Sequence, residues 1–268
     1  MPTEISTRET SRVIQWQPSH PSGSVIVCGT TSNVHEVLAA VGSRVVHLRA
    51  SVGAPPETEE GWRDCDAIRA ADLDAAIEGA GPPGTGGRQV AASLLVQSYA
   101  HRVTAVSLAA FAVGLPWPSP AAAATSVRLT GGRARALCFR AEALGEAGDV
   151  GSLVDAAFTS HLVPFVSAVR AWERLGERLV WANIAASCAA AFRAVEGSAR
   201  DRGDVGEQML VRRRAAELLE HAAWLEGTGW FDADSTDWGW QRSACCLWYR
   251  TAGGRTCEGC SLRRQGRA

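Results

Sequence analysis

Half of the chain's eight cysteines lie within sixteen residues, in the segment "CCLWYRTAGGRTCEGC". Cys245 and Cys246 are adjacent, Cys257 and Cys260 form a C-x-x-C pair, and a Gly-Gly turn lies between the two pairs. A C-x-x-C loop points two thiolates at one metal ion, because a glycine lets the backbone fold tightly around the pair. The Gly-Gly turn lets the chain reverse, so that the adjacent thiols can face the second pair. The segment therefore indicates either a metal site or disulfide bonds.

The cellular compartment decides between metal and disulfides. The N-terminal segment lacks a basic region followed by an apolar one, so no secretory signal is expected. The most apolar windows are too short or too interrupted to span a bilayer. We therefore expect a cytoplasmic protein with reduced thiols, in which the cluster binds metal. The other cysteines are scattered singly and are expected to be small buried apolar residues: Cys28, Cys65, Cys138 and Cys188.

The spacing favours an iron–sulfur cluster over zinc and leaves zinc open. A structural zinc site normally takes two C-x-x-C knuckles, and adjacent cysteines make a poor knuckle because neighbouring side chains diverge. A two-iron cluster spreads four ligand positions over a wider body. The spacing matches neither the plant-type nor the bacterial ferredoxin pattern. A disulfide between Cys245 and Cys246 would leave the second pair unexplained.

The pattern C-C-x10-C-x2-C, within "RSACCLWYRTAGGRTCEGCSL", resembles the C-terminal signature of the FhuF family of ferric-siderophore reductases. The similarity is strong over 242–262 and looser over 93–193, and it does not cover the first eighty residues. Ser261 stands where that family often has proline. The resemblance implies a [2Fe-2S] cluster with four cysteine ligands: Cys245, Cys246, Cys257 and Cys260.

The resemblance also implies an oxidoreductase that releases iron from siderophores by one-electron reduction of Fe(III). The expected partners are a ferric siderophore and an electron donor such as a ferredoxin or a flavin reductase, with peripheral membrane association as a further expectation. The net charge of −1 gives no reason to expect nucleic acid. The alternatives are a [2Fe-2S] electron-transfer or iron-sensing protein with another partner, a zinc-stabilised binding module, and a scaffold related to siderophore biosynthesis.

Positive charge surrounds the cysteines. Six arginines and one acidic residue, Glu258, follow Gln241. This charge would offset that of a cluster and could attract an anionic chelate or an acidic electron donor. The candidate docking residues are Arg242, Arg250 and Arg255. Further candidates for a cleft lie in the helical part of the chain: Tyr99, Arg102 and His161.

The elements that must position these residues give an α+β fold that is predominantly helical. It has a small N-terminal α/β region, a central β-hairpin and a C-terminal iron–sulfur segment. We expect three regions: 1–87 of unknown role, a helical core at 88–226, and the cluster-binding segment at 227–268. Tryptophans crowd the last region, where they would shield a cluster or line a cleft.

The apolar spacing predicts the individual elements. A short β-α-β unit is expected from strands at 24–30 and 43–49 around a helix at 32–42. A breaker-rich segment at 50–61 and a helix at 64–79 follow. Gly131-Gly132 predicts a hairpin of strands 125–130 and 133–140. Further helices are expected at 88–114, at 152–197 with a kink or break at Pro164 and Gly176, and at 207–226, before a loop leads to the cysteines.

Overall fold

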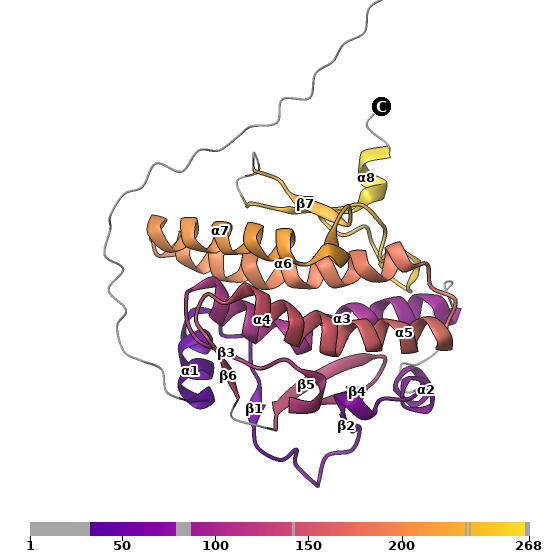
Figure 1. Cartoon of the computed structure of the whole chain (residues 1–268). Coiled ribbons are helices and arrows are strands. Elements are labelled where there is room, and N and C mark those ends of the chain that lie inside the picture. The colour runs from indigo at the N-terminus through magenta and orange to yellow at the C-terminus, as the bar shows by residue number, and fades with distance from the viewer. Residues whose placement is uncertain (1–32, 79–86, 141–142, 234, 236, 266–268) are drawn as a thin grey trace, which may run out of the picture. The chain divides into compact units, whose positions relative to one another are not determined.

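A computed structural model describes residues 33–78, 87–140, 143–233, 235 and 237–265 of the chain (Figure 1). They belong to a unit that begins at Thr31, and elements from all three expected regions contribute to it. The predicted class is confirmed, because the unit is mostly helical with small sheets.

Two long helices form the centre of the unit and position the candidate site. Helix α3 (Gly87–Ala112) packs along α6 (Glu177–Asp201), and α7 (Val205–His221) packs on α6 in turn. Most of α3 is buried, as its apolar and small residues on all sides predict. The expected long helix at 88–114 is thus confirmed. The 3₁₀ turn η4 (Ala223–Leu225) follows α7.

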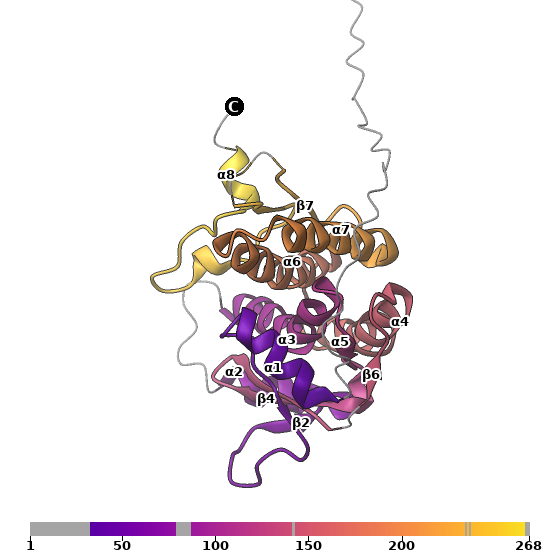
Figure 2. The ribbon, with the colours of Figure 1, turned by 90° about the vertical axis from the view of Figure 1, so that its left-hand side faces the viewer.

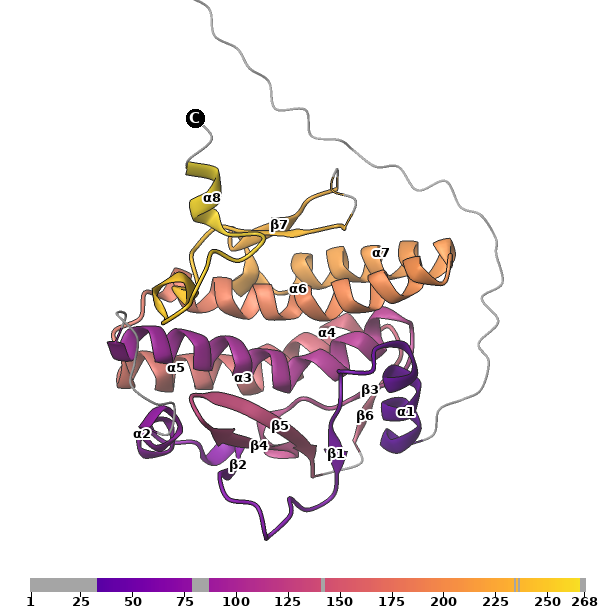
Figure 3. The ribbon, with the colours of Figure 1, turned by 180° about the vertical axis from the view of Figure 1, so that it is seen from behind.

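A second helical run lies beside α3 in the same layer (Figure 3). It consists of α4 (Val150–Val154), the π-helical segment η3 (Asp155–Leu162) and α5 (Val163–Trp172). The helix continues through Pro164, and the turns directly before this proline are π-helical, with the Val163 N–H donating to the Phe158 carbonyl five residues back. The expected break at Gly176 is confirmed, since this residue caps α6. By length and composition Val150–Trp172 could also cross a membrane, and half of its most apolar window is buried.

The main sheet covers the other side of α3, away from α6 (Figure 2). Its strand order is β1-β5-β4-β2, with β1 (Ser51–Val52) parallel to β5 (Arg133–Phe139). Strands β4 (Thr125–Thr130) and β5 form the predicted hairpin, and β2 (Trp62–Asp64) pairs antiparallel with β4. Both residues of the Gly131-Gly132 turn have positive φ, as a type I′ turn requires. Two short strands, β3 (Trp117–Pro118) and β6 (Leu144–Gly145), pair separately, and η2 (Ala122–Ala124) precedes β4.

The N-terminal elements depart most from expectation. Helix α1 (Val34–Arg44) forms, capped by Asn33, but the strand expected over 43–49 is wrong. Helix α1 takes its first two residues, and a strand forms later, at β1, where β5 offers a partner. The strand expected over 24–30 lies outside the described residues. The helix expected at 64–79 is shorter: η1 (Cys65–Ala67) precedes α2 (Ala70–Glu78).

The C-terminal segment contains a hairpin where a loop was expected. Strand β7 (Gly229–Phe231) pairs with β8 (Trp240–Arg242), and both contact α6. Phe231, at the end of β7, stacks on Trp238, just before β8, at a centroid distance of 3.9 Å. The chain then passes through η5 (Trp248–Arg250), which contacts α3, and ends in α8 (Ser261–Gln265).

Candidate functional site

The C-terminal segment brings all four clustered cysteines together as two pairs. The thiol of Cys245 is a close neighbour of that of Cys260, and the thiol of Cys246 is a close neighbour of that of Cys257. Each pair therefore joins one of the adjacent cysteines to one cysteine of the C-x-x-C loop. All four are free thiols; Cys246 and Cys260 are buried, whereas the other two are half-buried. We call these four residues the thiol cluster.

Three features of the backbone fold the segment in this way. Leu247 has a φ of 66°, in the left-handed region that a leucine rarely adopts, and so turns the chain directly after Cys246. Its N–H points at the Cys245 sulfur, 3.4 Å away. In the C-x-x-C loop, a Cβ on Gly259 would lie 1.8 Å from the Trp240 carbonyl oxygen. A glycine is therefore required there for the loop to pack against β8, although its φ is not positive.

A buried polar network ties the thiol cluster to the central helices. The Arg242 guanidinium, on β8, donates to the side-chain oxygen of Asn183 on α6. The Asn183 amide donates to the Ser93 hydroxyl at 2.9 Å, and this hydroxyl donates to the Cys246 carbonyl at 2.9 Å. All four residues are buried. The network therefore fixes Cys246 relative to both α3 and α6.

Arg242 is a buried cation without a carboxylate partner. It is 5% exposed, and no carboxylate of a described residue lies within 4 Å of its guanidinium. Its positive charge lies close to Cys246 and Cys257. A buried charge is costly unless an opposite charge or a metal site compensates it. The thiol cluster is therefore the group placed to supply the missing negative charge.

The ionisation of the thiols agrees with this arrangement. The hydrogen bond from Cys257, helped by the charge of Arg242, lowers the pKa of Cys246 to about 6. The same contact raises the pKa of Cys257, because this thiol keeps the shared proton. Burial raises the pKa of Cys245. The pair of Cys246 and Cys257 thus holds one negative charge beside Arg242.

Two of the four thiols line a cavity of about 480 Å³. Cys246, Cys257 and Trp248 form one side of it, α3 and α6 contribute further residues, and strand β5 contributes Arg133 and Arg135. With Arg102, the lining includes three arginines, and it contains no acidic residue. Its remaining members are Leu94, Gln97, Ser98, His101, Ala134, Ala186, Ser187 and Ala190. We call this cavity the arginine pocket. It is large enough for a small chelate.

The expected docking residues occupy different environments. Arg242 is buried against the thiols and is not available on the surface for a partner. Arg250 and Arg255 are exposed, so their role in docking stays a prediction.

The candidates from the helical region also lie in different environments. Arg102 lines the arginine pocket, but Tyr99 and His161 are buried in the core. The Tyr99 hydroxyl lies 2.6 Å from His161 Nε2, and His161 Nδ1 lies 2.5 Å from the Pro120 carbonyl. Burial lowers the pKa of His161 to about 4, so it is neutral at pH 7.

Sequence reasoning missed the other residues of the site. Arg133 and Arg135 follow the R-x-R spacing that places two side chains on one face of a strand, and this spacing could have identified them. Asn183 interrupts the apolar sequence "LVWANIAASCAAAF", which marks it as a buried polar group in need of partners. Ser93 has no comparable signal.

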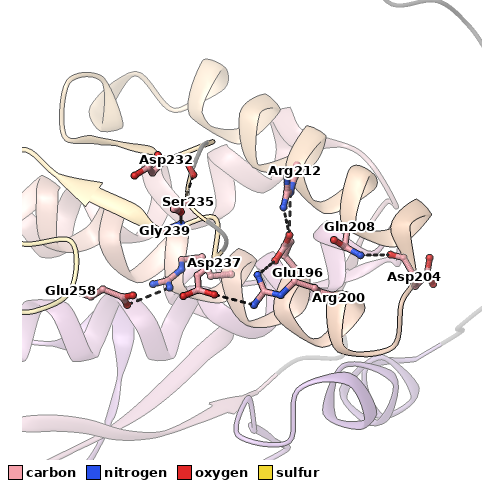
Figure 4. A network of polar contacts seen from close by, with 11 residues as sticks. Glu196, Arg200, Asp204, Gln208, Arg212, Asp232, Ser235, Asp237, Gly239 and Glu258 are labelled. Atoms are coloured by element: carbon pink, nitrogen blue, oxygen red, sulfur yellow. Dashed lines mark hydrogen bonds and ion pairs between the residues drawn. The ribbon is translucent and has the colours of Figure 1, made fainter.

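A second polar network lies along α6 near the C-terminal hairpin (Figure 4). Glu196 is 1% exposed and accepts hydrogen bonds from Arg212, with its Nε at 3.1 Å, and from Arg200 at 3.5 Å. Arg200 also pairs with Asp237 at 3.8 Å. This buried charge is fully compensated by protein groups.

The donor set of the thiol cluster suits a thiolate-bound metal group. Among the residues that the structure describes, no group of three or more His, Cys, Asp or Glu side chains is arranged to hold a metal ion. The thiols instead contact one another in pairs, so the pairs would have to separate to admit a metal. Four cysteine sulfurs are nevertheless the donor set of both Cys₄ zinc sites and two-iron clusters. The buried Arg242 adds the positive charge that such an anionic group requires.

Comparison with known proteins adds no relative. No family model matches this chain, and no curated protein matches it. What the resemblance over 242–262 implies therefore rests on the residues of that segment and is developed below as a proposal.

Proposed function

We propose that this protein is an iron–sulfur oxidoreductase that releases iron from siderophores by reducing Fe(III) to Fe(II). Its cofactor is a [2Fe-2S] cluster held by Cys245, Cys246, Cys257 and Cys260. The observation that carries the proposal is the position of four free thiols beside a buried arginine that has no carboxylate partner among the described residues, and at the edge of a cavity. A cytoplasmic location and an electron donor such as a ferredoxin or a flavin reductase belong to the same proposal.

The chemistry requires binding and electrostatics from the protein and no covalent step by a side chain. When bound, the cluster supplies a single electron, and the Fe(II) that results is held less tightly by the hard oxygen donors of a siderophore. Arg242 offsets the negative charge of the thiolates, which favours the reduced state. The Leu247 N–H, aimed at the Cys245 sulfur, acts in the same direction.

The arginine pocket gives the substrate a place next to the thiol cluster. A chelate inside it lies against Cys246 and Cys257, which would be cluster ligands. Trp248 covers part of the same wall and limits the access of water. The pocket thus holds the Fe(III) chelate within short range of the electron source.

Spectroscopy of anaerobically purified protein tests the proposal. We expect visible absorption, about two irons and two sulfides per chain, and an EPR signal after reduction by dithionite. Adding a ferric siderophore should remove that signal and produce Fe(II), captured by a ferrous chelator. Colourless protein with stoichiometric zinc would contradict the cluster. A cluster that no ferric chelate oxidises would favour an electron-transfer or iron-sensing protein.

A further inference from the structure

We propose that the arginine pocket selects Fe(III) chelates that carry net negative charge and carboxylate groups. The inference rests on the proposed function and specifies its substrate class. It predicts discrimination against neutral and cationic chelates of similar size.

The charge of the pocket is concentrated in three arginines from two elements. Arg102 lies on α3, and Arg133 and Arg135 lie two residues apart on β5. No carboxylate of a described residue lies within 4 Å of any of their guanidinium groups. Burial and the nearby charge of Arg135 lower the pKa of Arg102, although an arginine stays protonated. Like charges held this close are stabilised by an anion between them.

Both hydroxyls of the wall are already used within the protein. The Ser98 hydroxyl donates to the Leu95 carbonyl and accepts from the Ala134 N–H. The Ser187 hydroxyl donates to the carbonyls of Gln97 and Asn183. Gln97 and His101 also line the cavity, but the arginines are its permanently charged groups and are therefore the main groups left to recognise an anion. Their planar guanidinium groups match carboxylates in a bidentate way.

Two other cavities of the described residues lack this excess of unpaired cations. One, of about 750 Å³, contains Arg63 and Arg128, which pair with Asp72 and Glu59. The other, of about 330 Å³, contains Arg193, which pairs with Glu258. The arginines of these two cavities are thus paired with carboxylates, whereas the three in the arginine pocket are not.

The position of the arginines solves an electrostatic problem. Four thiolates around two irons carry net negative charge, which repels an anionic chelate at close range. The three arginines lie in the same cavity wall as Cys246 and Cys257 and offset this repulsion. They allow an anionic substrate to approach a cluster that would otherwise exclude it.

Binding of redox-inert gallium chelates tests the inference separately from reduction. Calorimetry on the cluster-loaded protein would compare Ga(III)-citrate, which is anionic, with Ga(III)-desferrioxamine B, which is cationic. The double variant Arg102→Gln/Arg135→Gln should bind Ga(III)-citrate at least about tenfold more weakly, because two charge-assisted contacts to carboxylates are lost. The variant Arg128→Gln, from the paired cavity, is the matched control and should bind as wild type.

Wild-type protein alone provides a second measurement if the double variant does not fold. Its affinity for Ga(III)-citrate should fall steeply between 50 and about 300 mM salt, as expected for binding dominated by exposed charges. Equal affinity for both gallium chelates, or binding of citrate that salt does not weaken, would overturn the inference. Such a result would leave the proposed reductase intact if the cluster still reduces cationic chelates, whereas zinc in place of iron would end the proposed function and not the selectivity for anions.

Discussion

Two buried charges lie along α6, and they are handled in opposite ways. Glu196 is 1% exposed and is held by two arginines (Figure 4). Arg242 is 5% exposed and meets the amide oxygen of Asn183, a backbone carbonyl and the thiol cluster. The first charge is complete within the protein, but the second has no carboxylate among the described residues. A buried ion pair says little about function, whereas a buried cation that lacks its anion indicates where an anionic group belongs.

The largest effect is expected at the ligands themselves. Replacing Cys257 with Ser should abolish or severely destabilise the cluster, because one of its four sulfur ligands is lost. The measurements are visible absorption and iron content. The control Cys138→Ser changes a buried thiol on β5, far from the others in sequence, and should leave the spectrum unchanged. If the two variants had the same spectrum, the ligand assignment would be wrong.

A substitution of Arg242, the buried charge without a carboxylate partner, tests the second half of the comparison. The variant Arg242→Gln keeps a donor for Asn183 but removes the cation, and cluster affinity should fall by about 10- to 100-fold. Competition with an iron chelator measures this loss. The free energy of unfolding of the metal-free protein should be affected much less than cluster retention, because the glutamine can still donate to Asn183. Undiminished cluster retention would show that Arg242 does not balance the cluster.

His161 is a buried titratable group that stays neutral, and its effect on stability can be compared with those of the charged Glu196 and Arg242. The pKa of His161 is about 4 in the folded protein and near 6.5 when unfolded, so the unfolded state binds more protons between these values. The contribution of His161 to the free energy of unfolding is therefore fully present above pH 6.5, and it falls by at most about 3 kcal/mol as the pH drops towards 4. The lowered pKa of His101 acts in the same direction. Urea unfolding from pH 7 to 4.5 measures this, and a flat profile would contradict it.

Loss of the Glu196 charge, which two arginines compensate, should lower the stability of the fold and leave the cluster content unchanged. The variant Glu196→Gln loses its charged contacts with Arg212 and Arg200, and the free energy of unfolding should drop by about 1–3 kcal/mol. Both arginines are partly exposed and can turn to water, which limits the cost. Cluster content, measured on the same samples, should equal that of wild type. A loss of iron would mean that the charges of Glu196 on α6 and Arg242 on β8 are coupled.

An exposed arginine should have the smallest effect. Replacing Arg255 with Gln removes a charge from the same segment as Arg242, but its side chain is exposed. We expect the free energy of unfolding to change by less than about 0.5 kcal/mol and the cluster content to stay constant. A loss comparable to that of Arg242→Gln would show that net charge, and not burial, is what the cluster requires.

The sequence predicted the parts of the fold that local patterns determine. The long helix at α3, the Gly131-Gly132 hairpin and the break at Gly176 each follow from apolar spacing or turn chemistry. The strands missed or misplaced, β1 and the β7–β8 hairpin, are two or three residues long. Such short strands depend on partners distant in the chain, which no local pattern reveals.

For the site, too, the sequence predicted what local spacing determines and missed what depends on the tertiary fold. Cysteine spacing was enough to expect that the four thiols would lie together, and the structure brings them into contact. Arg242 was predicted to dock a substrate or an electron donor and is buried, because its environment depends on Asn183, which is 59 residues away in the chain. The arginine pocket combines α3 with β5, and their proximity is a property of the tertiary fold.

The crossed pairing of the thiols has a consequence for biogenesis. Cys245 and Cys246 belong to different pairs, and each waits for a sulfur from the C-x-x-C loop. A nascent chain that has reached Gly254 therefore contains half of each pair and neither one whole. A cofactor held by these pairs would be inserted only after the second loop has been synthesised, when the sequence of helices α1 to α7 is already complete.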